Sequence, residues 1–356
     1  MPSNATILIA DISGYTDFLT TTEIVHSTHI INELLDVLLT ANADRFSLVE
    51  IEGDALLLYR EGEIVSRVEL TRHCVSLLTA FHSFLKVIER DRVCDCGACS
   101  TATGLDLKFI AHYGEVDHIA VGPIRKPAGV AMIVAHRLLK NSVPESSYVL
   151  ASCTLLDSAE SGRGRVFHGE ATGWLASADE YAAVGTVPYE YLSLAAHRDS
   201  IPEAPRSDVL VTPVGGLVDV RISAPMSRVY GALIDHESKR HWVKGLDDVI
   251  VEGEVQRVGS RHVCKVGGAK LDFETAQAVL DAERRVLVER VSLRGRGIEL
   301  YTYAELIAVS PSATLMRSGF APIDGAELPS EILDGFLSRK EQELERFKQY
   351  CESLDA

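Results

Sequence analysis

The sequence predicts an α+β protein of two domains. Apolar runs of strand length alternate with stretches of helical periodicity, and the 356 residues exceed what a single core usually needs. A segment rich in Pro, Ser, Asp and Arg over residues 197–213 has no sustained period, so it is the expected linker. The predicted domains are therefore residues 1–196 and 214–356, and each is long enough to fold alone.

In the first domain, strand and helix signals alternate from the start. Residues 6–12 form an apolar strand that ends in an acid, and residues 21–42 carry Ile and Leu at helical spacing. Two apolar stretches, 46–51 and 55–59, are joined by residues 52–54, a connection short enough for a hairpin. The remaining expected elements are a helix over 68–89, a strand over 105–112, a helix over 129–139, and short strands over 148–151 and 189–193.

The second domain is predicted to begin with a strand over 217–222 and one helix over 226–242. Several strand-like stretches follow through Leu315. The chain ends in an amphipathic helix with Pro329 near its start, where the missing N–H costs nothing. The apolar stripe of that helix is Leu333, Leu337, Leu344, Phe347, Cys351 and Leu354.

Charge and composition exclude several classes of partner. The net charge of −16 would repel nucleic acid and anionic membrane surfaces. The sequence has no apolar run of membrane-spanning length and no signal-peptide pattern at its start, so we expect a cytoplasmic protein. Seven cysteines, an odd number, also fit a reducing compartment.

Two aspartates each lie at the end of an apolar strand. Asp11 follows the run Thr6–Ala10, and Asp54 lies in the predicted hairpin. If the two strands are neighbours, the carboxylates converge as they do in sites that hold divalent cations beside a triphosphate. The alternative is that both are ordinary turn residues, the commoner role of a single strand-end Asp.

Four segments resemble, in order, the motifs of class III nucleotidyl cyclases. The matching segments are Ala10–Thr16 (ADISGYT), Gly53-Asp54, Ile110–Val116 (IAHYGEV) and Gly129–Arg137 (GVAMIVAHR). The resemblance covers residues 5–195. It implies a ferredoxin-like βαββαβ domain that binds Mg²⁺ or Mn²⁺ and a purine nucleotide and forms a homodimer.

The same resemblance implies roles for the matching residues. Asp11 and Asp54 would bind the metal ions, and Arg137 of the other subunit would stabilise charge on the reacting phosphate. Glu50 matches the position at which guanylyl-type members carry Glu, so any base preference leans towards GTP. The phosphates would be bound by the backbone N–H groups of one turn, which consists of Ile12, Ser13, Gly14, Tyr15 and Thr16.

Three features depart from the family pattern. Ile133 stands where the family has an Asn that orients the ribose, and Lys126 stands at the second base-reading position. No lysine between Asn141 and Ser200 supplies the late phosphate contact. Because one such donor is worth roughly 3 to 4 kcal/mol of transition-state stabilisation, we favour a catalytically degenerate domain that still binds metal or nucleotide.

Three cysteines crowd into the segment Cys94, Cys96 and Cys99. Three thiolates at this spacing suit one Zn²⁺, and a closed site normally has a fourth ligand. The candidates for that ligand are His73, Cys74 and His112. The alternatives are an exposed loop with free thiols and, less favoured, an iron–sulfur centre.

The second domain resembles the START-like (SRPBCC) helix-grip fold. The resemblance depends on the order of elements, on Ile222–Tyr230 (ISAPMSRVY) and on Trp242. It implies a cavity for a hydrophobic small molecule. Two pairs share a strand face and are candidates for its lining, although such residues are more often core or surface: His262 with Cys264, and Tyr301 with Tyr303.

Together these features predict a regulatory or sensor protein, in which a cyclase-like domain is joined to a ligand-binding domain. The first alternative is an active, GTP-leaning class III cyclase regulated by the ligand of the second domain. The second alternative is an SRPBCC-type enzyme that acts on a hydrophobic metabolite, with the first domain as a scaffold.

Overall fold

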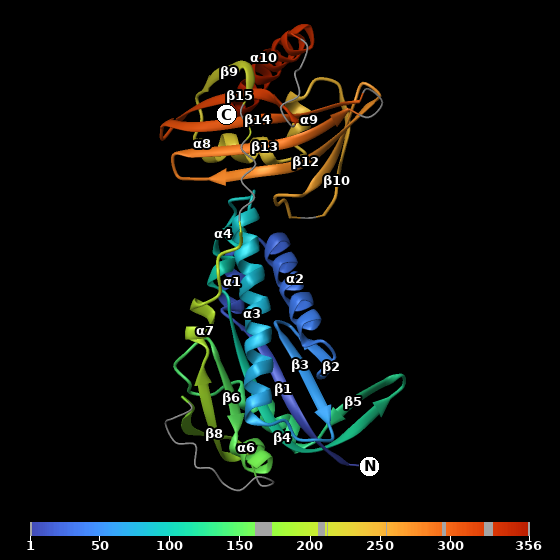
Figure 1. The fold of residues 1–356 in the computed structure, drawn as a ribbon, viewed down its shortest axis with the longest axis vertical. Helices are drawn as coiled ribbons and strands as arrows, with labels where there is room; N and C mark the ends of the chain where they lie inside the picture. The colour runs from blue at the N-terminus through green and yellow to red at the C-terminus, as the bar shows by residue number, and fades with distance from the viewer. Residues whose placement is uncertain are drawn as a thin grey trace. The chain divides into compact units, whose positions relative to one another are not determined.

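The protein divides into two compact units, which are described here from a computed structural model (Figure 1). Residues 2–160, 173–205, 211, 213–253, 255–293, 297–323 and 330–354 are described. The first unit comprises Met1–Val87 and Thr101–Ala204, and the second comprises Ile88–Ser100 and Pro205–Ala356. The segment that carries the three clustered cysteines is thus grouped with the second unit by its contacts, although the first unit surrounds it in the sequence.

The first unit is built on one mixed sheet. Its strands are β1 (Ser3–Ser13), β2 (Ser47–Glu52), β3 (Ala55–Glu61), β4 (Asp106–Val121), β5 (Ile124–Ala128), β6 (Tyr148–Ser152), β7 (Leu175–Tyr181) and β8 (Gly185–Ser193). The sheet order is β2-β3-β1-β4-β6-β8-β7, and β5 pairs with β4. β1 is antiparallel to both β3 and β4, whereas β4 and β6 are parallel. The order β2-β3-β1-β4, with helices after β1 and β3, is the βαββαβ arrangement that the sequence predicts.

Helices cover both faces of this sheet. They are α1 (Tyr15–Thr21), α2 (Ile24–Asn42), α3 (Arg67–Asp91), α5 (Val130–Leu138), α6 (Cys153–Glu160) and α7 (Ala195–Asp199). Helix α4 (Gly97–Thr101) lies almost entirely in the segment that is grouped with the second unit. On one face, Ile7 and Ile9 of β1 join the buried side of α5 in a core cluster. On the other face α3 is tied to the sheet by ion pairs, including Arg67 with Glu190. Along β1, Leu8, Ala10 and Ile12 alternate with Ile7 and Ile9 and are also buried, so this strand is covered on both faces.

Several elements of the first unit differ from the prediction. The strand expected to end at His112 continues to Val121 and turns back as β5 (Figure 1). Glu115, Asp117 and His118 interrupt the apolar residues of this extension, so a hydrophobicity pattern does not reveal it. Strand β7 and helix α6 were not predicted either. Of the predicted linker, residues 197–199 end α7, and residues 206–210 and 212 lie outside the described residues.

The second unit consists of a seven-stranded antiparallel sheet and its helices. The elements are β9 (Val214–Ile222), α8 (Met226–Ile234), α9 (Lys239–Trp242), β10 (Leu246–Val251), β11 (Arg261–Val266), β12 (Ala269–Leu280), β13 (Arg284–Leu293), β14 (Ile298–Ser310), β15 (Ala313–Pro322) and α10 (Ser330–Ser353). The sheet order is β10-β11-β12-β13-β14-β15-β9. Helices α8 and α10 share one core with this sheet, in which Val229, Leu306, Phe347 and Cys351 are buried.

The helix expected over residues 226–242 is interrupted. Asp235 accepts the Glu237 N–H at 3.0 Å, and the Ser238 hydroxyl donates to the Ala232 carbonyl at 2.6 Å. These local side-chain bonds replace helical bonds, which explains why the chain breaks into α8 and α9.

The predicted apolar stripe of the C-terminal helix α10 is buried at three described positions, but not at Leu354, which follows the end of the helix. Leu344, Phe347 and Cys351 are buried, whereas Leu354 is exposed. Pro329 and the Leu333 side chain lie outside the described residues. None of the described helices combines the length and the apolar character that a membrane crossing requires.

Candidate functional site

Asp11 and Asp54 meet at one edge of the first sheet. Asp11 lies near the end of β1, opposite Ala55 of β3, and Asp54 occupies the turn just before β3. The Ile12 N–H donates to the Asp54 carbonyl at 3.3 Å, which fixes this turn against β1. Both side chains are half-buried. The register of the two strands therefore brings together the two aspartates that the sequence singles out.

The two carboxylates interact electrostatically, and a lysine compensates part of their charge. Burial, followed by repulsion from Asp11, raises the pKa of Asp54 to about 6. Lys108, opposite Asp11 in β4, has its ammonium 3.2 Å from an Asp11 carboxylate oxygen. The sequence analysis did not identify Lys108. Two acids and one lysine leave a negative charge at this edge, which suits a divalent cation.

The predicted phosphate-binding turn keeps part of its expected geometry. Gly14 adopts φ of 87°, and α1 follows directly from Tyr15. Only glycine takes this conformation without strain, which accounts for its place in the motif. Ile12 is buried and its N–H is engaged by Asp54, so the expected phosphate contact from this N–H does not fit; Ser13–Thr16 remain candidates.

The two predicted base-reading residues are paired with each other. The Lys126 ammonium donates to a Glu50 carboxylate oxygen at 2.5 Å. Lys126 lies in the β5 arm and Glu50 in β2, and both side chains are about half exposed. Glu50 is therefore already paired with Lys126, at the position where a guanine base was expected to donate a hydrogen bond.

Helix α5 presents Ile133 and Arg137 on an exposed face, one turn apart. The Ile133 side chain is 52% exposed, and no described residue forms an ion pair with Arg137. Gly114 permits close packing of this helix, because a Cβ there would lie 2.9 Å from the Cβ of Ala131. Gly114, which belongs to one of the cyclase-like motifs, thus allows α5 to pack closely. The apolar Ile133 of the same helix stands where a polar contact to the ribose was expected.

The three candidates for a fourth zinc ligand are held inside the first unit. His112 is buried and bonded to the Ser152 hydroxyl at 2.7 Å. His73 is buried and stacks on Phe46, with centroids 5.3 Å apart. Cys74 is fully buried, and burial raises the pKa of its thiol. Each of these side chains therefore has a structural role in the core.

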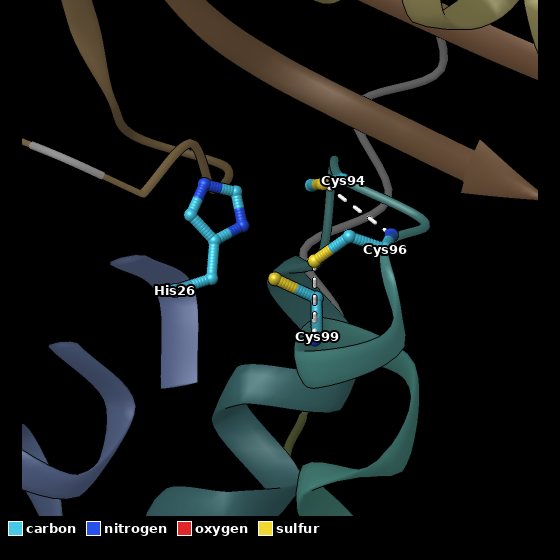
Figure 2. A group of neighbouring side chains, drawn as sticks. All are labelled: His26, Cys94, Cys96 and Cys99. Carbon is cyan, nitrogen blue, oxygen red and sulfur yellow. Dashed lines mark hydrogen bonds between the residues drawn. The ribbon is translucent and has the colours of Figure 1, made fainter. Parts of the chain in front are cut away.

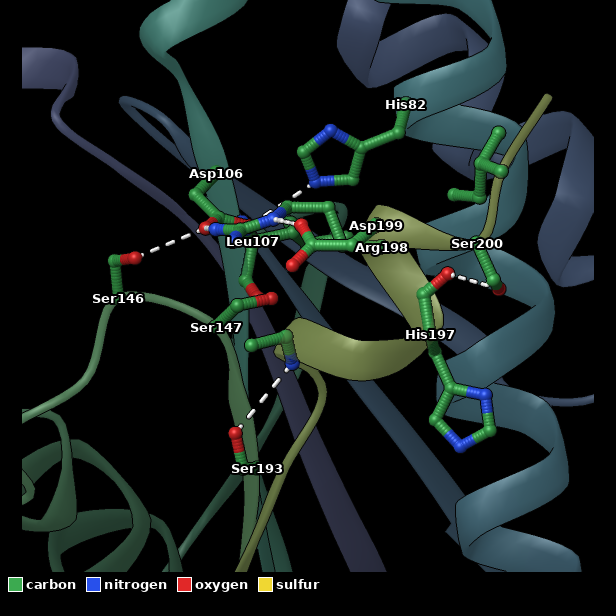
Figure 3. Close-up of polar contacts among 12 residues, drawn as sticks. His82, Asp106, Leu107, Ser146, Ser147, Ser193, His197, Arg198, Asp199 and Ser200 are labelled. Carbon is green, nitrogen blue, oxygen red and sulfur yellow. Dashed lines mark hydrogen bonds and ion pairs between the residues drawn. The ribbon is translucent and has the colours of Figure 1, made fainter. Parts of the chain in front are cut away.

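A buried charge network ties α3, β4 and α7 together (Figure 3). Asp106 accepts hydrogen bonds from His82 at 3.0 Å, from Ser146 at 2.9 Å and from Arg198 at 2.7 Å. Burial alone would raise the pKa of Asp106, but the bonds from His82, the Leu107 N–H and the serines outweigh it and hold that pKa well below its usual range. Its central carboxylate, that of Asp106, is buried and bonded on several sides, so we assign the network a stabilising role.

The three clustered cysteines converge within the second unit (Figure 2). The sulfur atoms of Cys94, Cys96 and Cys99 all lie within 4.8 Å of one another. The Cys96 N–H donates to the Cys94 sulfur at 3.4 Å, and the Cys99 N–H to the Cys96 sulfur at 3.5 Å. The figure also labels His26, which belongs to the first unit. Burial raises the pKa of Cys96 to about 11 despite the Cys99 N–H, and the Cys94 side chain and burial raise the pKa of Cys99. A metal ion bound by these thiols would therefore have to displace their protons.

The cysteine segment is packed into the core of the second unit. Val93 is fully buried in the same cluster as Val229 and Phe347. The Tyr230 hydroxyl donates to the Val93 carbonyl at 2.9 Å, and Arg285 pairs with Asp95 at 2.5 Å. The thiols are therefore held by a folded segment, which argues against the alternative of a loose exposed loop.

The second unit encloses a cavity of about 390 Å³ between its sheet and α10. The wall is mostly apolar, and it includes Cys264 and Tyr303 from the predicted pairs. His262 is buried, and neither His262 nor Tyr301 is among the lining residues. Ligand pockets commonly have volumes of about 300 to 1,000 Å³ and predominantly apolar walls, which this cavity matches.

Sequence comparisons connect part of the chain to proteins of unknown function. The family model described as protein of unknown function (DUF2652) matches residues 31–148. The uncharacterized protein Rv2561/Rv2562 of Mycobacterium tuberculosis (strain ATCC 25618 / H37Rv) is 35% identical over 126 residues, which cover 34% of this chain. The match spans 58% of that relative.

The solved structures that resemble the chain include nucleotidyl cyclases, over about half of its length. The guanylyl cyclase Cya2 is 17% identical, with a TM-score of 0.40, and the match covers 54% of this chain and 92% of that one. The adenylyl cyclase CyaB from P. aeruginosa is 14% identical, with a TM-score of 0.36, and the match covers 59% and 98%.

Proposed function

We propose that the protein is a regulatory protein whose first unit binds a divalent cation and a purine nucleotide with little or no turnover. The observation that carries the proposal is the meeting of Asp11 and Asp54 beside the turn Ser13–Thr16, whose backbone N–H groups remain candidates for binding phosphate. Mg²⁺ or Mn²⁺ would bind to these carboxylates and displace the Lys108 ammonium. When bound, the cation would screen the phosphates of the nucleotide.

Two features favour binding over catalysis. Glu50 is neutralised by Lys126, so the base would meet an ion pair instead of a free carboxylate. Ile133 offers only hydrocarbon where an orienting amide is expected, and each missing donor is worth roughly 3 to 4 kcal/mol. The rival function, an active cyclase, is favoured by the preserved aspartates and by the exposed Arg137.

A homodimer fits the apolar surface of the first unit. Four aliphatic side chains of α5 and the β4–β5 hairpin are exposed: Ile119, Val121, Val130 and Ile133. Exposed aliphatic side chains concentrated on neighbouring elements are typical of interaction surfaces. We propose that a second copy covers them and brings Arg137 to the partner's nucleotide.

We further propose that Cys94, Cys96 and Cys99 hold one Zn²⁺. The three sulfurs already converge, and the segment is anchored by Val93 and Asp95. A tetrahedral site would leave one position for water or for another side chain. The role of this ion would be structural, because the surrounding segment belongs to a packed core.

For the second unit we propose the binding of a hydrophobic small molecule in the 390 Å³ cavity. The order of strand, short helices, six strands and long helix supports the START-like interpretation of the sequence. The nucleotide-binding and ligand-binding units would then form one regulatory protein, as the sequence suggests.

Nucleotide binding and turnover are tested together on the purified chain. We expect a fluorescent GTP analogue to bind in the presence of Mn²⁺, and we expect binding to weaken at least about tenfold in Asp54→Asn, because one charge-assisted contact is lost. We expect cyclic nucleotide formation from GTP or ATP to stay at the level of a protein-free control.

The outcomes separate the candidate functions. A cyclic product that disappears in Asp54→Asn would establish the rival, an active cyclase. Failure of the wild-type chain to bind either GTP or ATP analogues would contradict nucleotide binding altogether.

A further inference from the structure

A buried lysine lines the apolar cavity of the second unit. Lys239 begins helix α9 and is only 6% exposed, yet it is one of the residues that line the 390 Å³ space. Much of the wall around it is hydrocarbon or aromatic, as Leu271, Leu300 and Phe320 illustrate. Burying an ammonium among such groups is costly unless it is paired and hydrogen-bonded.

Within the described residues, the ammonium of Lys239 has one hydrogen-bond acceptor. It donates to Nε2 of His262 at 3.0 Å and lies 5.6 Å from the centre of the Phe273 ring. An ammonium has three N–H donors, so two of them have no acceptor in this part of the chain. The lysine is therefore held in place but incompletely satisfied.

His262 is fixed in one orientation and carries no charge in this arrangement. Because Nε2 accepts from Lys239, Nδ1 carries the proton, and it faces Glu289 at 3.8 Å. The ring is stacked on Phe273, with centroids 4.6 Å apart. Burial and the charge of Lys239 lower the pKa of His262 to about 3, which agrees with a neutral imidazole. The lysine thus donates to a neutral partner, and the Glu289 carboxylate, which also lines the cavity, faces the other ring nitrogen of that partner.

A second unsatisfied donor lies one helical turn away. Trp242 also lines the cavity and is 7% exposed, and its indole N–H has no hydrogen-bond partner among the described residues. Residues three apart on a helix lie on the same side, so Lys239 and Trp242 offer donors from one face of α9. The cavity therefore combines apolar walls with unsatisfied donors. Of the two carboxylates in its lining, Glu343 pairs with Lys340 and Glu289 faces His262.

We propose that Lys239, assisted by Trp242, is the anchor for the carboxylate of an amphipathic monocarboxylate ligand such as a medium-chain fatty acid. The carboxylate would accept the unused N–H groups of Lys239, and the hydrocarbon chain would lie along the apolar wall. A volume of 390 Å³ equals about 13 water molecules of liquid, which suits a chain of moderate length. The inference rests on the proposed ligand-binding function of the second unit and names its ligand class.

Calorimetric titration of the full chain with decanoate and with 1-decanol separates the headgroup from the hydrocarbon. We expect the wild-type chain to bind decanoate at least about tenfold more tightly than 1-decanol, since a hydrogen bond to a charged group is strong. Lys239→Met should remove this preference while it retains 1-decanol binding, and Lys239→Arg should preserve the preference. Lys244→Met, the same change at an exposed lysine that is not among the lining residues, should leave both affinities within about twofold.

Each result bears on a different claim. An undiminished preference in Lys239→Met would overturn the role of Lys239. Should Lys239→Met fail to fold, the wild-type comparison decides, because equal affinity for the acid and the alcohol would overturn the inference. If the wild-type chain binds neither compound, the proposed ligand-binding function itself fails.

Discussion

Replacing Cys94, Cys96 and Cys99 with serine is expected to lower the affinity for Zn²⁺ by about a thousandfold or more. Thiolate ligands account for much of the large binding free energy of structural zinc sites. Competition with a chromophoric chelator measures the affinity. Co²⁺ substitution provides a second readout, because sulfur-to-cobalt charge-transfer absorption appears only when thiolates bind the ion.

The matched control for the cysteine cluster is Cys153→Ser. Cys153 is also partly exposed, but it lies in α6 of the first unit and is not a member of the cluster. We expect this variant to bind one Zn²⁺ as the wild-type chain does. Equal zinc affinity in the triple variant and the control would contradict the cysteine site.

Replacing Asp106 with alanine is expected to reduce the free energy of unfolding by about 3 kcal/mol or more. The change removes the only described acceptor of His82 at this site and one partner of Arg198, in surroundings where Asp106 is 5% exposed. Removing one member of a buried ion pair typically costs about 3 to 5 kcal/mol. Chemical denaturation followed by circular dichroism measures the loss.

Asp199→Ala tests the same arginine from its exposed side. Asp199 accepts from Arg198 at 2.9 Å, but its side chain is 67% exposed, so the expected loss is below about 1 kcal/mol. The pH dependence adds a check on the charge of Asp106. A pKa below its unfolded value of about 3.9 stabilises the fold above that pH, and this contribution is lost as the pH falls further. The difference in unfolding free energy between wild type and Asp106→Asn should therefore shrink below about pH 4. Similar losses of stability in Asp106→Ala and Asp199→Ala would contradict the stabilising role of the network.

The meeting of Asp11 and Asp54 could be predicted because both signals are local. Each acid ends an apolar run, and the hairpin between residues 46 and 59 is marked by its short turn. The partners of these residues could not be predicted in the same way. Lys108 reaches Asp11 through the pairing of strands that lie far apart in the sequence, and that register has no local signature.

The pairing of Glu50 with Lys126 illustrates the same limit. Both positions were singled out for base recognition, but their contact depends on how the β5 arm folds back, and polar residues conceal that arm. The break between α8 and α9 was missed because the interrupting bonds involve side chains that tolerate either conformation. The proposed anchor of the cavity depends on Lys239 of α9, His262 of β11 and Glu289 of β13. These residues lie far apart in the sequence, so no spacing indicates that they meet.

The cysteine segment lies within the first predicted domain in the sequence but is grouped with the second unit in the structure. Its place within the first domain of the sequence suggested ligands from the first core, such as His73 and His112. In the structure, residues 88–100 belong to the second unit through Val93 and Asp95. Spacing alone identified the three thiols correctly as neighbours, but it carried no information on what holds them.

Titration of the chain with Mn²⁺, followed by the electron paramagnetic resonance signal of the free ion, tests the paired-aspartate site most directly. We predict that the wild-type chain binds Mn²⁺ and that Asp11→Asn and Asp54→Asn each weaken this binding by about tenfold or more, whereas Asp17→Asn, at an exposed acid of α1, does not. Wild-type affinity in both site variants, or no binding by the wild-type chain, would contradict the account.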